Sequence, residues 1–131
     1  MKGFRVVLAG CLLAFFGTAI ASEDPPADHV KLMKSMGKNF GEIRKNVDLK
    51  SNADAMMAAL KDVGAFWKAR NSEIAMASCK KNFEGAKMLS EAAAKDDKAA
   101  IADAKKMIGD GCKGCHDQHR EKISDTEYKI K

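Results

Sequence analysis

The sequence predicts an all-α protein, and within that class an antiparallel up-down four-helix bundle. Ala, Lys, Met, Leu and Glu, which favour helices, are abundant, whereas β-branched residues are sparse. Pro25 and Pro26 are the only prolines, so the long stretch after them has no proline to break a helix. Apolar residues recur at steps of three and four in four segments of about 20 residues, separated by short polar breaks. Four such helices pack most simply as an up-down bundle.

Residues 1–21 have the composition of a secretory signal peptide. Lys2 and Arg5 precede the apolar run "VVLAGCLLAFFGTAIA", which ends in the small-x-small pattern that signal peptidases cleave. The run is short for a membrane span, which needs about 20 apolar residues, so an uncleaved anchor is the less favoured alternative. We therefore expect a periplasmic or otherwise exported protein. Its mature chain, residues 22–131, is predicted to form one domain without a membrane span.

Charge and cysteine content restrict the function of the mature chain. Without the two basic residues of the signal peptide, the 23 basic residues fall to 21, against 18 acidic ones, and the two signs are interspersed. This pattern argues against a nucleic-acid-binding surface. Cys11 leaves with the signal peptide, so the mature cysteines are Cys79, Cys112 and Cys115. An odd number in an exported chain argues against a simple disulfide framework.

The four helices are predicted from their capping residues and apolar faces. The expected N-terminal caps are Asp28, then Ser51 or Asn52, then Ser72, and finally Asp97. The apolar faces comprise His29, Met33, Met36, Phe40, Ile43 and Val47; Ala53, Met56, Leu60, Val63 and Trp67; Ala75, Cys79, Phe83, Ala86, Leu89 and Ala93; and Ile101, Ala104, Ile108, Cys112, Cys115 and Ile123. The polar tail from Ser124 is expected to fray, and no strand is predicted.

The segment Cys112-Lys113-Gly114-Cys115-His116 matches the attachment site of a c-type haem. Each thiol adds across one of two haem vinyl groups, and two cysteines three residues apart can reach both. His116 follows directly and can bind the iron as the proximal ligand. Glycines at positions 109, 111 and 114 are expected to let the flat macrocycle approach the backbone. The sequence therefore predicts one covalently attached haem c.

Other uses of this cysteine pair fit less well. A thioredoxin-like redox pair requires a βαβ context, which is absent from the predicted elements. A zinc site would crowd Cys112, Cys115, His116 and His119 onto one helix or would need a remote ligand. A plain disulfide between the two cysteines would leave the histidine unexplained.

Two segments resemble class II c-type cytochromes, the cytochrome c-prime family. "IGDGCKGCHDQHR" (108–120) is similar to the last helix of that family, with its haem motif followed by Asp117 and Arg120. "KLMKSMGKNF" (31–40) is similar to the first helix of the low-spin branch, in which a methionine supplies the sixth iron ligand. The resemblance implies that this ligand is Met33. The chain departs from the family pattern at His119, where an aromatic residue is usual, and is shorter between helices two and three.

The sixth iron position has three candidate states. Met33 as ligand gives a six-coordinate, low-spin haem suited to electron transfer, because a neutral thioether favours ferrous iron. Met36 lies nearly one turn further along the same face and is an alternative ligand. If neither methionine binds, the iron is five-coordinate and open to small gases. The residues alone are also compatible with both methionines as core filling.

Other residues near the motif are given supporting roles. His29 shares the face of Met33 and could compete for the iron through its imidazole, but it is expected to face solvent or to cap the helix. His119 is expected beside the haem or at a propionate, without binding iron. Cys79 is expected to be a buried small apolar residue, with an intermolecular disulfide as the alternative. The large aromatic residues Phe40, Phe66, Trp67 and Phe83 are expected to pack in the core or against the haem.

The sequence therefore predicts an exported monohaem c-type cytochrome that carries single electrons between redox partner proteins. No nucleophile–base pair and no carboxylate pair stands out, so no catalytic residue is assigned and an enzyme is not expected. Some lysines are expected to frame the haem edge and to attract an acidic partner. The alternative function is a five-coordinate haem protein that binds or buffers gases such as nitric oxide. A homodimer is an alternative to a monomer.

Overall fold

Four long helices and a short C-terminal hairpin make up the computed structural model, which describes residues 21–131. The elements are α1 (Ala27–Arg44), α2 (Leu49–Ala69), α3 (Glu73–Ala94), α4 (Lys98–His119), β1 (Arg120–Lys122) and β2 (Tyr128–Ile130). The predicted all-α four-helix bundle is confirmed. The predicted signal peptide lies outside the described residues except for Ala21. No helix between residues 21 and 131 is long and apolar enough to cross a membrane.

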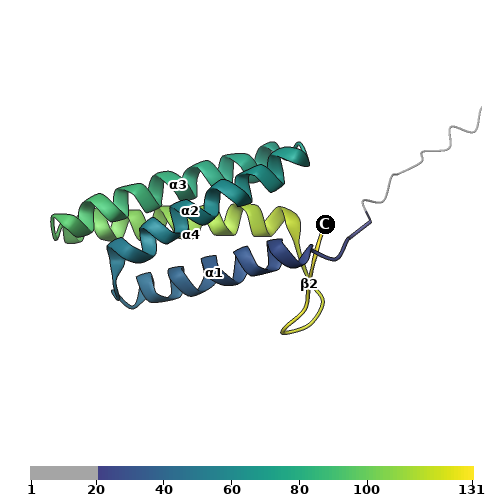
Figure 1. The fold of residues 1–131 in the computed structure, drawn as a ribbon, viewed down its shortest axis with the longest axis horizontal. Helices are drawn as coiled ribbons and strands as arrows, with labels where there is room; N and C mark the ends of the chain where they lie inside the picture. Colours follow the sequence, from purple (N-terminus) through teal and green to yellow (C-terminus); the bar gives the residue numbers. More distant parts are fainter. Residues whose placement is uncertain (1–20) are drawn as a thin grey trace, which may run out of the picture.

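The helices pack in chain order as an up-down bundle. Short turns reverse the chain after α1, α2 and α3, so each helix lies antiparallel to the next (Figure 1). The pair that would close the bundle, α1 and α4, packs much less closely than the other neighbouring pairs. These two helices meet near Phe40 and Gly109, and Lys105 donates a hydrogen bond to Asn46. Closure therefore occurs at one end, where α1 finishes and α4 starts.

Two of the four predicted helix caps are present. Ser72 Oγ accepts the backbone N–H of Ala75 at 3.1 Å, and Asp97 Oδ1 accepts that of Ala100 at 3.0 Å. The predicted cap at Asp28 is wrong, because α1 begins at Ala27, directly after Pro26, and Asp28 lies inside its first turn.

The second helix also begins earlier than predicted. Asp48, at a φ of 41°, precedes Leu49, so Ser51 and Asn52 lie inside the first turn of α2. The Asn52 amide turns back and donates to the Val47 carbonyl at 2.9 Å. Asn52 therefore stabilises the turn before α2 instead of capping its N-terminus.

Most of the predicted apolar residues are buried or half-buried, and three are exposed. Val47 is 42% exposed, Phe83 38% and Ile123 48%. Val47 and Ile123 lie beyond the ends of α1 and α4. Phe83 is displaced because the buried stripe of α3 also contains the polar residues Ser78 and Asn82. An apolar pattern that omits these two positions places the centre of the stripe incorrectly.

The C-terminal tail forms a hairpin where fraying was predicted. Strands β1 and β2 pair antiparallel, with Arg120 opposite Ile130, at the end of the bundle where α1 begins (Figure 1). Glu23 and Ile130 exchange two backbone hydrogen bonds of 2.8 Å, which add an N-terminal segment to the ladder. The Arg120 guanidinium lies 3.4 Å from the centre of the Tyr128 ring. These partners are remote in sequence, which explains why local patterning did not indicate a strand.

A comparison of Asp97→Ala with Asp28→Ala tests the assigned caps. Asp97→Ala is expected to lower the free energy of unfolding by about 1 kcal/mol, because it removes a capping bond. Asp28 makes only an exposed ion pair with Lys31, so Asp28→Ala is expected to change the free energy of unfolding by less than about 0.5 kcal/mol. Urea unfolding followed by circular dichroism measures both. Equal losses would contradict the assignment.

Candidate functional site

A cavity of about 550 Å³ lies between α1 and α4, in the half of the bundle where these helices do not close. The predicted functional residues all line it: Met33, Cys112, Cys115 and His116. Residues of α2, α3 and the hairpin complete the wall. The structure therefore brings the C-terminal motif of α4 to the same space as the methionine of α1. This volume is within the 300–1,000 Å³ range typical of sites for small molecules and cofactors.

The motif itself remains helical, because α4 continues through it to His119. Cys112 and Cys115 are one turn apart and half-buried, and both are free thiols. The Cys112 thiol lies 3.9 Å from Asn82 Oδ1 of α3. Two thiols on one helical face and an imidazole in the next position thus share the cavity wall.

Glycines in the motif face protein instead of the cavity, which corrects the prediction that they admit a macrocycle. A Cβ atom at Gly111 would lie 2.7 Å from the Asn82 side-chain carbon and 3.1 Å from the Ser78 carbonyl oxygen. A Cβ atom at Gly114 would lie 3.2 Å from Ser78 Oγ. These glycines therefore let α4 approach α3 closely. Gly109 faces Phe40 of α1 at 3.6 Å.

Burial keeps the thiols protonated and the His116 imidazole neutral. It raises the pKa of Cys115 to about 12, with smaller contributions from Cys79 and Cys112. Burial also raises the pKa of Cys112, against an opposing effect of Asn82. The pKa of His116 is lowered by burial and then by Arg120. A neutral imidazole is the form that binds metals.

The two methionines of α1 have different surroundings. Met36 is buried in the main core cluster with Ile43, Met56 and Leu60. Met33 is half-buried and packs between this cluster and a second one around Val63 and Trp67. Both methionines line the cavity. Met33 is thus the less enclosed of the two thioethers on the wall opposite the motif.

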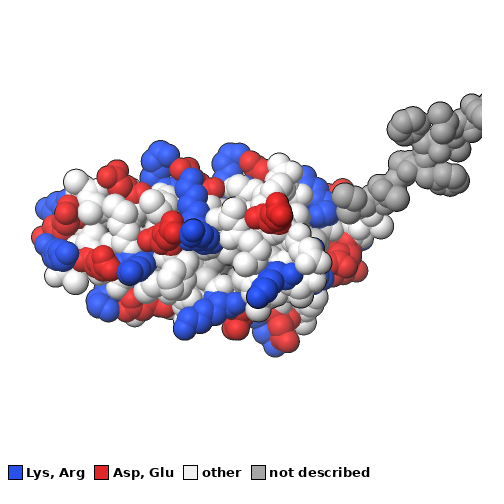
Figure 2. All heavy atoms as spheres, turned by 90° about the horizontal axis from the view of Figure 1, so that it is seen from above, with Lys and Arg blue, Asp and Glu red and all other residues white. Residues whose placement is uncertain are grey.

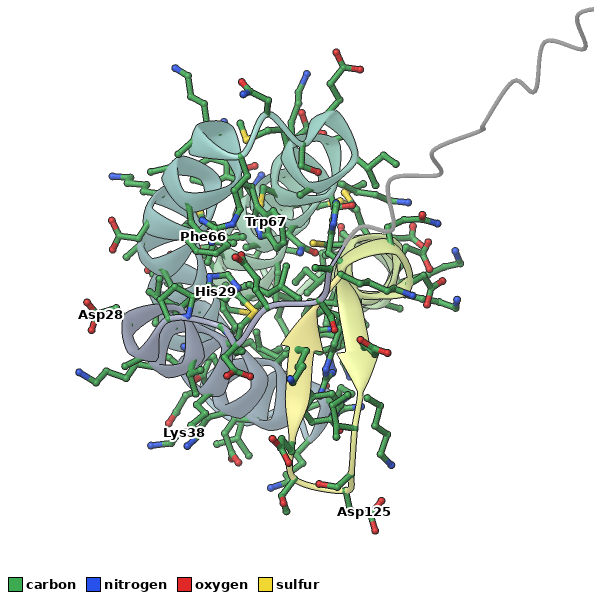
Figure 3. The ribbon with its side chains drawn as sticks, turned by 90° about the vertical axis from the view of Figure 1, so that its right-hand side faces the viewer. Asp28, His29, Lys38, Phe66, Trp67 and Asp125 are labelled. Carbon is green, nitrogen blue, oxygen red and sulfur yellow. The ribbon has the colours of Figure 1, made fainter. Side chains whose placement is uncertain are left out.

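His29 is buried, so the prediction that it faces solvent or caps α1 is wrong. It is 7% exposed and stacks on Phe66 with ring centroids 3.9 Å apart. Its ring meets Trp67 edge-on at 5.8 Å, whereas Asp28 beside it points outward (Figure 3). Burial lowers its pKa, and the positive charge of Arg70 lowers it further. Its place in the Met33 series of spacings was the sequence signal for this burial.

The last two residues singled out in the sequence, His119 and Cys79, both contact other parts of the protein. His119 Nε2 lies 2.6 Å from Ser72 Oγ, its Nδ1 lies 3.3 Å from the Lys131 carbonyl oxygen, and its ring packs on Trp67. His119 therefore joins the end of α4 to the start of α3 and to the tail. Cys79 is buried, as predicted, and is a free thiol.

Sequence patterns did not indicate the hairpin as part of the site. Thr126, Glu127, Tyr128, Lys129 and Ile130 all line the cavity. Ile130 also packs on the cluster around Val63 and Trp67. The hairpin therefore covers one side of the cavity and limits its contact with water. Only its contact with distant residues gives it this position, so no local signal could have revealed it.

Positive side chains outnumber negative ones around the cavity. Its charged lining residues are Lys34, Arg44, Arg120, Glu127 and Lys129. This set favours a ligand that is apolar over most of its surface and carries negative charge at its edge. In residues 21–131 no three His, Cys, Asp or Glu side chains converge on a position where they could hold a metal ion.

No family model, curated protein or solved structure matches this chain. The assignment of a function therefore depends on the residues and the geometry of the cavity.

Proposed function

We propose that this protein is an exported monohaem c-type cytochrome that carries single electrons between redox partner proteins. The main support is that one cavity is lined by Cys112, Cys115 and His116 from α4 and by Met33 from α1. The spacing of the first three residues is the one that covalent haem attachment requires. The resemblance of the two terminal helices to class II c-type cytochromes agrees with the proposal.

The residues around the cavity fit this cofactor. Its walls include large apolar side chains of two helices, such as Phe40 of α1 and Leu60 and Val63 of α2. Four cationic side chains can neutralise the two propionates of a haem. The iron carries four porphyrin nitrogens of its own, so it needs only one or two protein donors. Bound haem supplies the exchange of one electron between ferric and ferrous iron.

Each residue at the site has a distinct role in this proposal. Cys112 and Cys115 hold the macrocycle by thioether bonds, each formed when S–H adds across a vinyl C=C. The neutral His116 imidazole binds iron from the α4 side. The Met33 thioether binds it from the α1 side and, as a neutral soft donor, favours the ferrous state. The hairpin excludes water from part of the site.

A second candidate is a five-coordinate haem protein that binds gases such as nitric oxide. It is supported by the packing of Met33 against apolar clusters of the core, which is also what a purely structural methionine does. The optical spectrum separates the two candidates. A low-spin ferric spectrum with the weak red band of methionine ligation supports the electron carrier, whereas a high-spin spectrum that shifts with carbon monoxide supports the gas-binding protein.

Expression of the full chain in cells with c-type haem maturation machinery tests the proposal. We expect a red protein that begins near Ser22 and keeps its haem after denaturation and acid-acetone extraction. Mass spectrometry should give the mature chain plus one haem. The same gene expressed without the maturation machinery is the control and should give no covalent pigment. Haem that extracts freely from the matured protein, or a colourless product, would overturn the proposal.

Charged side chains of both signs alternate over the face shown in Figure 2. In this proposal the basic rim that attracts an acidic partner consists of the cations that line the cavity. Lys34 and Lys129 are cavity-lining examples.

A further inference from the structure

His29 has an unsatisfied ring nitrogen in the interior of the protein. In the part of the chain that the structure describes, His29 Nδ1 is the one buried side-chain nitrogen or oxygen atom without a hydrogen-bond partner. A buried polar group left unpaired costs roughly 1–3 kcal/mol. The side chain is more than nine-tenths buried and forms part of the cavity wall. This nitrogen is therefore free to bind a group that enters the cavity.

The position of His29 indicates which part of a haem could bind this nitrogen. His29 precedes Met33 by four residues on α1, so the two side chains share one helical face. Its ring packs on Phe66 and Trp67, in the apolar cluster that Cys115 also contacts. The propionates of a haem lie on the edge opposite the vinyl groups. A ring on the Cys115 side is therefore poorly placed for a propionate and is better placed for the iron.

The chemical state of His29 also suits a metal donor. Burial and neighbouring positive charge favour its neutral form, which has a free lone pair on one ring nitrogen. The side chain needs only a turn about its last torsion, which is a broad one, to change which ring atom faces the cavity. Such a turn takes the ring out of its stack on Phe66, so the exchange of ring atoms requires this contact to open briefly.

We propose that His29 is a second ligand on the α1 side of the cavity, and that its imidazole binds the haem iron when the Met33 thioether does not. The inference rests on the proposed function, because it requires a covalently held haem. It means that the α1 helix offers two donors one turn apart, a thioether and an imidazole. Loss of the Met33 bond then leaves the iron six-coordinate, so the sixth position stays closed to gases.

Three variants of the matured holoprotein test this inference. Met33→Ala is expected to lose the red methionine band, to remain low-spin and to shift its reduction potential downward, because imidazole replaces the thioether. Met33→Ala/His29→Phe keeps an aromatic ring on Phe66 but removes the nitrogen donor. We expect it to become high-spin and to bind carbon monoxide in the ferrous state. His29→Phe alone is the control and should keep the spectrum of the wild type.

The outcomes separate the inference from the proposed function. A high-spin Met33→Ala protein that retains haem after denaturation would overturn the role of His29 and leave the haem assignment intact. Retention of the red band in Met33→Ala would assign the vacated position to Met36 and would also overturn it. A low-spin double variant would do the same. Wild-type protein without covalent haem would overturn both the role of His29 and the proposed function. If Met33→Ala yields no holoprotein, Met33→Leu, which preserves side-chain volume, provides the same spectra.

Discussion

Replacement of both Cys112 and Cys115 by alanine is expected to abolish covalent haem attachment. These are the two thiols that line the cavity from α4 one turn apart, and each accounts for one thioether bond in the proposal. The double variant should therefore lose all of its haem on a denaturing gel stained for peroxidase activity. Each single variant should keep one thioether, and the reduced pyridine adduct should shift its α band toward that of a haem with one free vinyl group.

Cys79→Ala is the matched control for the thiol variants. Cys79 is the third mature cysteine, lines the same cavity and is also a buried free thiol, but it lies on α3 outside the motif. Its replacement should leave the covalent haem content at the wild-type level. Loss of haem in Cys79→Ala comparable to that in the double variant would show that the cavity thiols act as a group and would contradict the assignment of the motif.

Helices were predictable because their determinants are local. Caps at Ser72 and Asp97 each act over three residues, and the 3.6-residue period repeats within each segment. The cysteine–histidine motif can be recognised for the same reason, since its thiols and imidazole are spaced within five positions of one helix, and its role in haem attachment stays a prediction. Met33 is proposed as a ligand only through a resemblance, because a methionine on an apolar stripe has no pattern that separates a ligand from core filling.

The burial of His29 and the C-terminal hairpin, which sequence patterns did not predict, depend on contacts between distant segments. His29 is buried because Phe66 of α2 covers it, and Ile130 pairs with Glu23 from the other end of the chain. Neither of these contacts has a fixed sequence spacing, so a one-dimensional pattern does not identify the partner. The exposure of Phe83 has a local cause, because the buried stripe of α3 includes the polar residues Ser78 and Asn82, which an apolar pattern does not count.

The cavity itself follows from an uneven distribution of close packing. Helices α3 and α4 approach at Gly85, Gly111 and Gly114, where each added Cβ atom would contact the other helix at 3.2 Å or less. No equivalent row of close contacts joins α1 to α4, which meet only near the other end of the bundle. The motif is therefore held rigidly from the α3 side while its thiols and imidazole face an open space.

Gly111→Ala is expected to destabilise the protein, whereas Gly64→Ala is expected to stabilise it. A methyl group at position 111 would overlap the buried Asn82 amide and press on the Ser78 carbonyl, which belongs to the backbone and cannot turn away. Such overpacking typically lowers the free energy of unfolding by about 1–3 kcal/mol. This loss exceeds the gain from the higher helix propensity of alanine.

Gly64 provides the same substitution without the clash, because nothing lies within 4 Å of its added Cβ atom in the interior of α2. Alanine should there raise the free energy of unfolding by about 0.5–1 kcal/mol. Urea unfolding of the two holoproteins, followed by circular dichroism, measures both changes against the wild type. Because Gly111 precedes Cys112, its variant should also broaden the spectrum of the proposed haem, as the shifted helix moves the thiols relative to Met33. If the two variants were equally stable, α3 and α4 would not be in close contact at the motif. The close approach of these helices at their glycines would then not explain the cavity.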